Sequence, residues 1–402
     1  MATMTETAET NDIHLSTLSN RTEQDRLEQQ PEISNEASAI APLELSFTVS
    51  LKVFSAAFCF FNAGVNDGSL GVLVPYILRG YNITTAWLAI PYGIAFFGWL
   101  LAAIFGGFVR STLGTGGYIA TGAALQLLAQ LLRFWKPPFG LFAATWFFVA
   151  LGQAFQDTQA NTFVAIIKNA HRWLGVIHGC YAVGSLVGPL IAAAIASNIE
   201  GQWATFYYVP TGIGAFNLGL TVWAFRDEII FFKRFYGSST SQHERPRRSI
   251  AAKRELAATL KLKSVWLISL FFFLNLGAGI AAGGWVVEYL HAVRGGSLSQ
   301  VGYISSAFYG GIALGRFVLA EPTFRFGEKR MLLLYAVLTV ALQIVFWRVP
   351  NIATDAVMIA LIGFLQGPCF VTGVSVASKL LPQELQSSSL GESSTIPATL
   401  NS

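Results

Sequence analysis

Long apolar runs separated by short polar turns fill the chain between residues 48 and 378. A bilayer core of about 30 Å needs roughly 20 mostly apolar residues in each helix that crosses it. About ten runs meet this requirement, and the pattern predicts an all-α, polytopic membrane protein with one transmembrane helix for each run. The predicted helices span 48–76, 84–108, 116–134, 139–167, 174–197, 203–225, 264–290, 298–320, 330–348 and 352–378.

Composition agrees with this pattern. Hydrophobic residues make up 53% of the 402 residues, charged residues only 12%, and the mean hydropathy is +0.52. A soluble domain usually carries about 25% charged residues. The net charge of +4 is too small to indicate nucleic-acid binding. The three cysteines lie singly in apolar segments without a CxxC pair, so we expect neither a metal site nor a disulfide framework.

The separators predict the topology. The longest, about 226–263, carries ten Lys and Arg residues, and such residues concentrate on the cytoplasmic side. The odd-numbered loops carry only Arg79, Arg133, Lys136, Arg294 and Arg348. Both termini are therefore expected in the cytosol. The predicted domains are a disordered tail (1–47), a six-helix bundle (48–226), a basic linker (227–263), a partial four-helix bundle (264–381) and a polar tail (382–402).

The two bundles show traces of a duplicated half. The fourth helix carries Gly152-Gln153 followed by Gln156, and the tenth carries Gly363 followed by Gln366. Internal repeats of this kind are common in secondary transporters.

Several motifs resemble a known family. They are VNDGSLG (65–71) in the first helix, HGCYAVG (178–184) in the fifth, GGW (283–285) in the seventh, and loop sequences after the second and eighth helices that include RFGEKR (325–330). Over about residues 48–385 the chain is similar to the major facilitator superfamily. Within it, the motifs resemble the fucose permease-like branch and its fungal members of the bypass-of-stop-codon type.

This resemblance implies the major facilitator fold and solute:proton symport of sugars. It also implies that an acid in the first helix and one in the fourth, matched here by Asp67 and Asp157, serve as sugar contact and proton site. Two departures stand out. Gly279 occupies a position where the fungal pattern has a Glu. The family usually has twelve helices, whereas ten are predicted here, arranged as six plus four with the last two missing.

The polar residues of the first and fourth helices indicate a binding site on their own account. An Asp at a helix centre costs about 2.5–3.5 kcal/mol on insertion scales, so it is expected to face a cavity or a partner. Gln153, Gln156 and Asp157 share one face of the fourth helix. Amides beside a carboxylate suit a polyhydroxylated ligand, because an amide both donates and accepts hydrogen bonds. Asp157 is the first choice for the proton carrier, and a polar contact between helices is the structural alternative for both acids.

The remaining candidates are less specific. The predicted substrate contacts are Asn62, Asn66, Asp67, Gln153, Gln156, His178, Tyr181, Asn275, Trp285 and Gln366, and the predicted gate residues are Arg110 and Arg316. Arg316 is expected to anchor the cytoplasmic gate with a helix end or an acid such as Glu321. His178 could equally be a satisfied hydrogen-bonding residue, and Trp285 an interfacial one.

The predicted function is proton-coupled transport of a small polar solute, with sugar-like molecules favoured, by alternating access. No GxSxG, HExxH or P-loop occurs, so we expect neither an enzyme nor an ATP-driven pump, and we expect no cofactor or metal. The expected partners are the solute, protons and the lipid bilayer, without nucleic acid, and the chain is expected to be a monomer. Two alternatives remain: a truncated, non-transporting membrane protein or regulator, and an efflux carrier for amphipathic metabolites.

Overall fold

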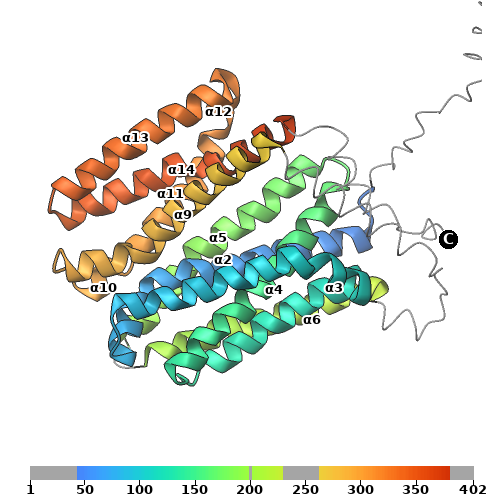
Figure 1. Ribbon diagram of the computed structural model, residues 1–402, viewed down its shortest axis with the longest axis horizontal. Coiled ribbons are helices and arrows are strands. Elements are labelled where there is room, and N and C mark those ends of the chain that lie inside the picture. Colours follow the sequence, from blue (N-terminus) through green and yellow to red (C-terminus); the bar gives the residue numbers. More distant parts are fainter. Residues whose placement is uncertain (1–42, 199–201, 230–261, 381–402) are drawn as a thin grey trace, which may run out of the picture. The chain divides into compact units, whose positions relative to one another are not determined.

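A computed structural model describes residues 43–198, 202–229 and 262–380 (Figure 1). The described part is helical and contains no strand, only an isolated bridge between Leu43 and Ile167. The first half comprises α2 (Phe47–Tyr81), α3 (Thr85–Arg133), α4 (Phe139–Ala165), α5 (Ala170–Asn198), the short helix η1 (Trp203–Tyr207), α6 (Tyr208–Ala224) and the short helix η2 (Arg226–Glu228).

The second half follows after residue 262. It comprises α9 (Lys263–Ala292), α10 (Leu298–Val301), α11 (Ile304–Val318), α12 (Ala320–Phe326), α13 (Glu328–Arg348) and α14 (Ile352–Leu380). The predicted tails and most of the predicted linker lie outside the described residues, so the domain boundaries stay predictions.

All ten predicted helical segments are present, and two of them are joined. Helix α3 runs for 49 residues and contains both the second and the third segment, with a kink at Gly114. Gly114 has φ 76° and ψ 171°, a conformation that glycine tolerates and other residues avoid. Seven described helices are long and apolar enough to cross a membrane, or eight if the bent run from Leu298 to Phe326 forms one span. This confirms an all-helical, multi-pass membrane protein.

Local sequence explains where the helices end. The Ser46 hydroxyl accepts a hydrogen bond from the Val49 amide at the start of α2. Asn82 closes the same helix in the left-handed conformation, with φ 52°. Between α3 and α4, Lys136 is left-handed and Pro138 precedes the first turn of the next helix. These short connections make α2, α3 and α4 neighbours.

Glycines bring α2 and α5 into close contact. A Cβ on Gly68 would collide with the carbonyl oxygen of Ser185, and a Cβ on Gly184 would collide with that of Phe61. Small residues allow helix backbones to approach closely in membrane proteins. The two helices therefore pack backbone to backbone, which holds Asp67 of α2 beside the interior face of α5.

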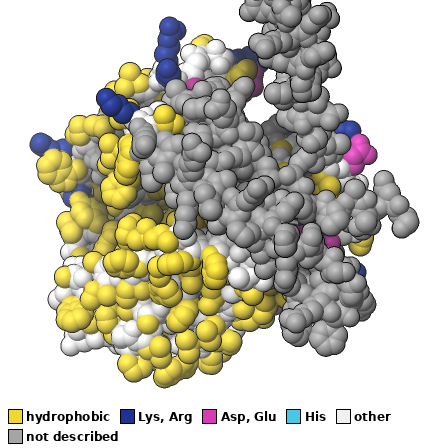
Figure 2. Space-filling model, turned by 45° about the vertical axis from the view of Figure 1, so that its right-hand side comes forward, with side chains coloured by type: hydrophobic (Ala, Val, Ile, Leu, Met, Phe, Trp, Pro, Cys, Tyr) yellow, Lys and Arg dark blue, Asp and Glu magenta, His cyan; other side chains and the backbone are white. Residues whose placement is uncertain are grey.

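The outer faces are apolar. Large side chains are exposed along α3, α9 and α13, among them Phe97 (59%), Phe273 (71%) and Leu333 (68%). Figure 2 shows a face covered by hydrophobic side chains, with Lys and Arg gathered toward its upper edge. Exposed apolar surface on this scale suits a protein surrounded by lipid.

An ion-pair cluster ties the end of the first half together. The Lys52 ammonium of α2 lies 2.7 Å from an Asp227 carboxylate oxygen and also pairs with Glu228. The two acids belong to η2, which follows α6. These ion pairs hold η2 against the start of α2.

Candidate substrate and proton site

Asp67 lies at the centre of a hydrogen-bonded cluster formed by three helices. Its Oδ1 accepts hydrogen bonds from Gln153 Nε2 of α4 at 2.8 Å and from Asn66 Nδ2 at 3.1 Å. Its Oδ2 accepts a hydrogen bond from the Tyr181 hydroxyl of α5 at 3.0 Å. Three hydrogen-bond donors around one carboxylate stabilise a negative charge that would otherwise be unfavourable in the membrane interior.

A second polar network lies along α2 and its neighbours. Asn62 Nδ2 donates to Gln126 Oε1 of α3 at 3.0 Å, and Gln126 Nε2 donates to Gln156 Oε1 of α4 at 2.8 Å. Gln156 Oε1 also accepts from Asn217 Nδ2 of α6 at 3.1 Å. Asn62 and Gln156, both predicted substrate contacts, are thus buried and paired inside the bundle (4% and 2% exposed). A substrate would reach them only by displacing these partners.

Arg133, which the sequence assigns to an outer loop, is instead buried at the end of α3, with 1% of its surface exposed. Its Nε donates to Thr145 Oγ1 at 2.7 Å, and one terminal nitrogen donates to Asn66 Oδ1 at 3.4 Å. The guanidinium also lies 4.8 Å from the centroid of the Trp146 ring. These contacts offset the cost of burying the charge.

Sequence reasoning missed four of these polar residues. Gln126, Gln130 and Arg133 recur on one face of α3, and Asn217 lies on α6. The spacing on α3 at i, i+4 and i+7 was a usable signal, because residues so spaced share a helix face. The surrounding residues of this segment are mostly apolar, which hides the polar face in a hydropathy pattern.

Asp157 stands apart from the cluster around Asp67. Its Oδ1 accepts from Asn161 Nδ2 of the next helical turn at 3.3 Å. It is half-buried, and Asp67 is near enough for the two carboxylates to interact electrostatically. Two acids that share a low-dielectric region resist simultaneous ionisation.

His178 and Tyr181 have different surroundings although they share a face of α5. Tyr181 binds Asp67, as described above. The His178 ring packs edge-on against Phe60 at 5.0 Å between centroids and lies 5.9 Å from Phe370 of α14. His178 is thus half-buried among aromatic rings, away from the direct contacts of Asp67.

The candidates of the second half form two separate contacts. Gln366 Nε2 of α14 donates to the Asn275 carbonyl of α9 at 3.0 Å and lies 3.3 Å from the Asn275 side-chain oxygen. Trp285 of α9 stacks on Tyr92 of α3, with 6.3 Å between ring centroids. The first contact joins two helices of the second half, and the second joins the two halves.

The two predicted gate arginines lie in different environments. Arg316 of α11 donates to the His178 carbonyl of α5 at 3.1 Å, so it links the halves. Its predicted acidic partner was wrong, since Glu321 pairs with Arg325 one turn away. Arg110 lies on α3 before the kink at Gly114, close enough to Tyr118 for an electrostatic interaction.

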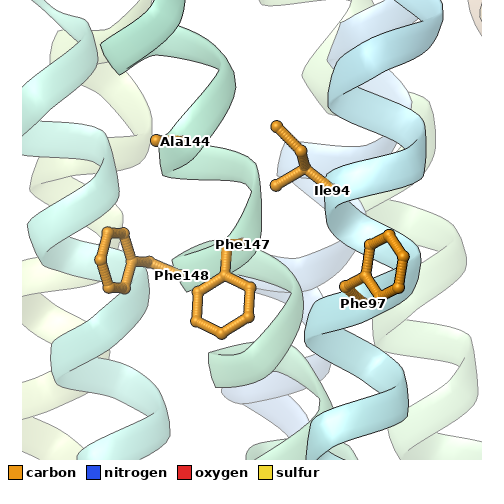
Figure 3. Close-up of a pocket in the computed structure, with 5 residues that line it drawn as sticks. All are labelled: Ile94, Phe97, Ala144, Phe147 and Phe148. Carbon is orange, nitrogen blue, oxygen red and sulfur yellow. The ribbon is translucent and has the colours of Figure 1, made fainter.

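Two cavities differ sharply in chemistry. A hollow of about 370 Å³ is lined by Ile94 and Phe97 of α3 and by Ala144, Phe147 and Phe148 of α4, all apolar (Figure 3). It offers nothing to bind a polar solute. A cavity of about 10 Å³ beside Asn66, Ser69 and Arg133 has room for roughly one water molecule. In this conformation the polar cluster is closed around its own hydrogen bonds.

Among the described residues, no group of three or more His, Cys, Asp or Glu side chains could hold a metal ion. The carboxylates of α2 and α4, Asp67 and Asp157, each accept hydrogen bonds from amide side chains.

Comparisons with known proteins agree with this arrangement. Residues 56–396 match the sequence profile of the Major Facilitator Superfamily. A relative, Bypass of stop codon protein 6 of Saccharomyces cerevisiae, is 23% identical over 365 residues, which cover 85% of this chain and 73% of the relative.

Solved structures share the fold. A bacterial homologue of the human lysosomal transporter Spinster aligns with a TM-score of 0.62 at 15% identity, covering 87% of this chain and 79% of its own. FucP in its outward conformation aligns at 0.57 and 16%, covering 85% and 88%. The nucleoside transporter NupG aligns at 0.63 and 13%, covering 85% and 86%. Since the sequence match spans most of the chain, the protein belongs to the Major Facilitator Superfamily of membrane transporters and is not an enzyme.

Proposed function

We propose that the protein is a proton-coupled secondary transporter of a small polar solute, with sugar-like molecules favoured. The observation that carries the proposal is Asp67, a carboxylate inside a helical bundle with donors from two further helices, Gln153 and Tyr181. Such a cluster is costly in a membrane unless it binds something polar. Solved relatives include a fucose:proton symporter and a nucleoside transporter, both of which handle hydroxylated molecules.

The groups around Asp67 suit a hydroxylated solute. One sugar hydroxyl can donate a hydrogen bond to the Asp67 carboxylate. The amide of Gln153 or Asn66 can then donate a hydrogen bond to the adjacent sugar hydroxyl or accept one from it. We propose that some of the other predicted contacts meet the solute when the halves separate: Asn62, Gln156, His178, Asn275, Trp285 and Gln366. Rocking of two halves around a midplane site is the general mechanism of such folds.

Proton coupling is assigned to Asp157 and Asp67 together. Their mutual electrostatic interaction makes the proton affinity of one depend on the charge of the other. Solute binding at Asp67 would then change the proton affinity of Asp157. Asp157 has fewer donors than Asp67, so it is the proposed carrier.

The proposed gate is the contact between Arg316 and the His178 carbonyl. It joins α11 to α5, and the two halves must part at this end for the site to open. Arg110 is proposed to assist at the same end. This end would face the cytosol, because Lys168 and Arg172 lie around the start of α5, Lys329 and Arg330 lie at the start of α13, and Lys and Arg favour that side. We also propose that both termini lie in the cytosol and that the carrier is a monomer.

The test is transport by the full chain reconstituted in liposomes, with a panel of radiolabelled sugars and nucleosides. An imposed proton gradient should drive accumulation of at least one of them. Asp157→Asn should abolish this accumulation and spare exchange of labelled for unlabelled solute, because exchange needs no proton release. Asp157→Glu, which keeps a titratable group, is the matched control and should retain some accumulation.

Two results would contradict the proposal. Gradient-driven accumulation by Asp157→Asn at the wild-type level would remove Asp157 as the carrier. Uptake of no sugar or nucleoside, combined with expulsion of amphipathic dyes, would favour the efflux alternative instead.

A further inference from the structure

The buried guanidinium of Arg133 has no role in the proposed site, yet it is held at considerable cost. Charged side chains inside a membrane protein are rare and almost always pair with one another or line a polar pathway. Among the described residues, Arg133 makes no ion pair within 4.0 Å, and one of its terminal nitrogens has no hydrogen-bond partner. Asp67 is the acid that interacts electrostatically with the Arg133 guanidinium inside the bundle.

Asn66 connects the two charges. Its Oδ1 faces two donors, Gln130 Nε2 at 2.8 Å and the Arg133 guanidinium at 3.4 Å. Because the guanidinium can only donate, the amide oxygen must point toward Arg133 and the amide nitrogen toward Asp67. The structure thus fixes the orientation of Asn66, and its NH₂ group donates to Asp67 Oδ1.

The two oxygens of Asp67 are consequently unequal. Oδ1 accepts from two amide NH₂ groups, those of Asn66 and Gln153, and an amide nitrogen cannot accept a proton in return. Oδ2 faces the Tyr181 hydroxyl, which can either donate or accept. A proton can therefore bind Oδ2 if the Tyr181 hydroxyl rotates from donor to acceptor, and no other bond of the cluster has to break.

The space around Arg133 argues against a substrate anion there. The cavity at Asn66, Ser69 and Arg133 measures about 10 Å³, whereas a carboxylate or phosphate group is several times larger. Aromatic rings close the remaining sides, with Tyr207 at 5.5 Å and Phe142 at 5.6 Å from the guanidinium. The cation faces its own protein, not a ligand.

We propose that Arg133 is a positioning residue and fixed counter-charge for Asp67, that it acts through Asn66, and that it directs proton exchange to Asp67 Oδ2. The inference deepens the proposed function, on which its relevance to coupling rests. The incoming proton forms an O–H bond at Oδ2 and leaves to water by the same bond, so no other group is consumed. The charged or titratable groups around Asp67 are Arg133 on α3, Asp157 on α4, Tyr181 on α5 and Tyr309 on α11.

The test measures the proton itself and needs no solute. The full chain in lipid nanodiscs is titrated by infrared difference spectroscopy, and the protonated carboxyl band of Asp67 is identified by its loss in Asp67→Asn. Arg133→Gln should move the midpoint of this band to higher pH by about 1–3 pH units, the size expected when a nearby opposite charge is removed. Arg133→Lys should stay close to wild type, because the charge remains. Arg79→Gln, at an exposed arginine, should leave the midpoint unchanged.

Asn66→Leu provides an independent test, which also serves if Arg133→Gln fails to fold. It removes the connecting amide and keeps the cation, so the midpoint should rise by a smaller amount. The proposal is overturned if Arg133→Gln or Asn66→Leu titrates like wild type, or if Arg133→Lys shifts as far as Arg133→Gln. Failure of the proposed function would give a different result: the wild-type chain would show no uptake, while the shifts of the titration midpoint in the variants would still be seen.

Discussion

The two halves of the molecule differ in what they bury. The first half encloses polar networks from five helices, α2 to α6, around Asn62, Asp67 and Gln156, whereas the second half shows one interior amide contact, between Asn275 and Gln366, among its described residues. In the most apolar stretch of α2, 56% of the residues are buried, whereas none of the residues in the corresponding stretch of α9 is buried. Among the described residues, the hydrogen bonds of buried amides are therefore concentrated in α2–α6, and we propose that this half holds the site.

The same contrast appears in helix packing. Glycines of α2 touch backbone on both sides, with Gly68 against Ser185 of α5 and Gly71 against Gly283 of α9. Gly277 of α9 has no atom within 4 Å of where its Cβ would be. Helix α2 thus contacts both α5 of the first half and α9 of the second half through its glycines.

The largest expected effect is at Asp67. Asp67→Asn keeps the shape of the side chain but replaces an acceptor by a donor that faces Gln153 or Tyr181. Hydrogen bonds to a charged group are worth about 1.5–3 kcal/mol each, so uptake of the transported sugar should fall roughly 10- to 100-fold. Initial uptake rates in proteoliposomes measure this. Uptake within twofold of wild type would mean that the first half does not hold the site.

An intermediate effect is expected from matched glycine substitutions. Gly68→Ala forces a methyl group into the Ser185 backbone and should lower the free energy of unfolding by about 1–3 kcal/mol. Gly277→Ala meets open space and should be neutral or stabilising by up to about 1 kcal/mol, because Ala favours helix over Gly. Thermal unfolding of the purified variants measures both. Equal losses for the two variants would show that α2 and α9 are packed alike.

The smallest effect is expected in the second half. Gln366→Leu removes the hydrogen bond to the Asn275 carbonyl, a neutral contact worth about 0.5–1.5 kcal/mol. Uptake should fall no more than about tenfold, whereas Gln153→Leu, which removes a donor to Asp67, should cost more. The ratio of the two uptake rates is the measurement. If Gln366→Leu proved the more damaging variant, the assignment of the chemistry to the first half would be reversed.

Several features were predictable from sequence because they depend on local pattern. The apolar runs predicted the helices, and an isolated Asp67 in such a run predicted an interior acid. The partners of Arg133 and Arg316 were not predictable, since an arginine is long enough to reach either water or a buried partner. Which it reaches depends on helices distant in sequence: Asn66 and Thr145 for Arg133, His178 for Arg316.

The class of protein, the helical segments and the acids on α2 and α4 follow from the amino-acid sequence, since hydropathy and motif spacing are properties of contiguous residues. Which polar groups meet follows from the packing of the helices. This packing buries Arg133, fixes the orientation of Asn66 and distinguishes the two oxygens of Asp67. Hydrogen bonds and buried charges are set by side chains converging from different helices, and no periodicity along one helix encodes that convergence.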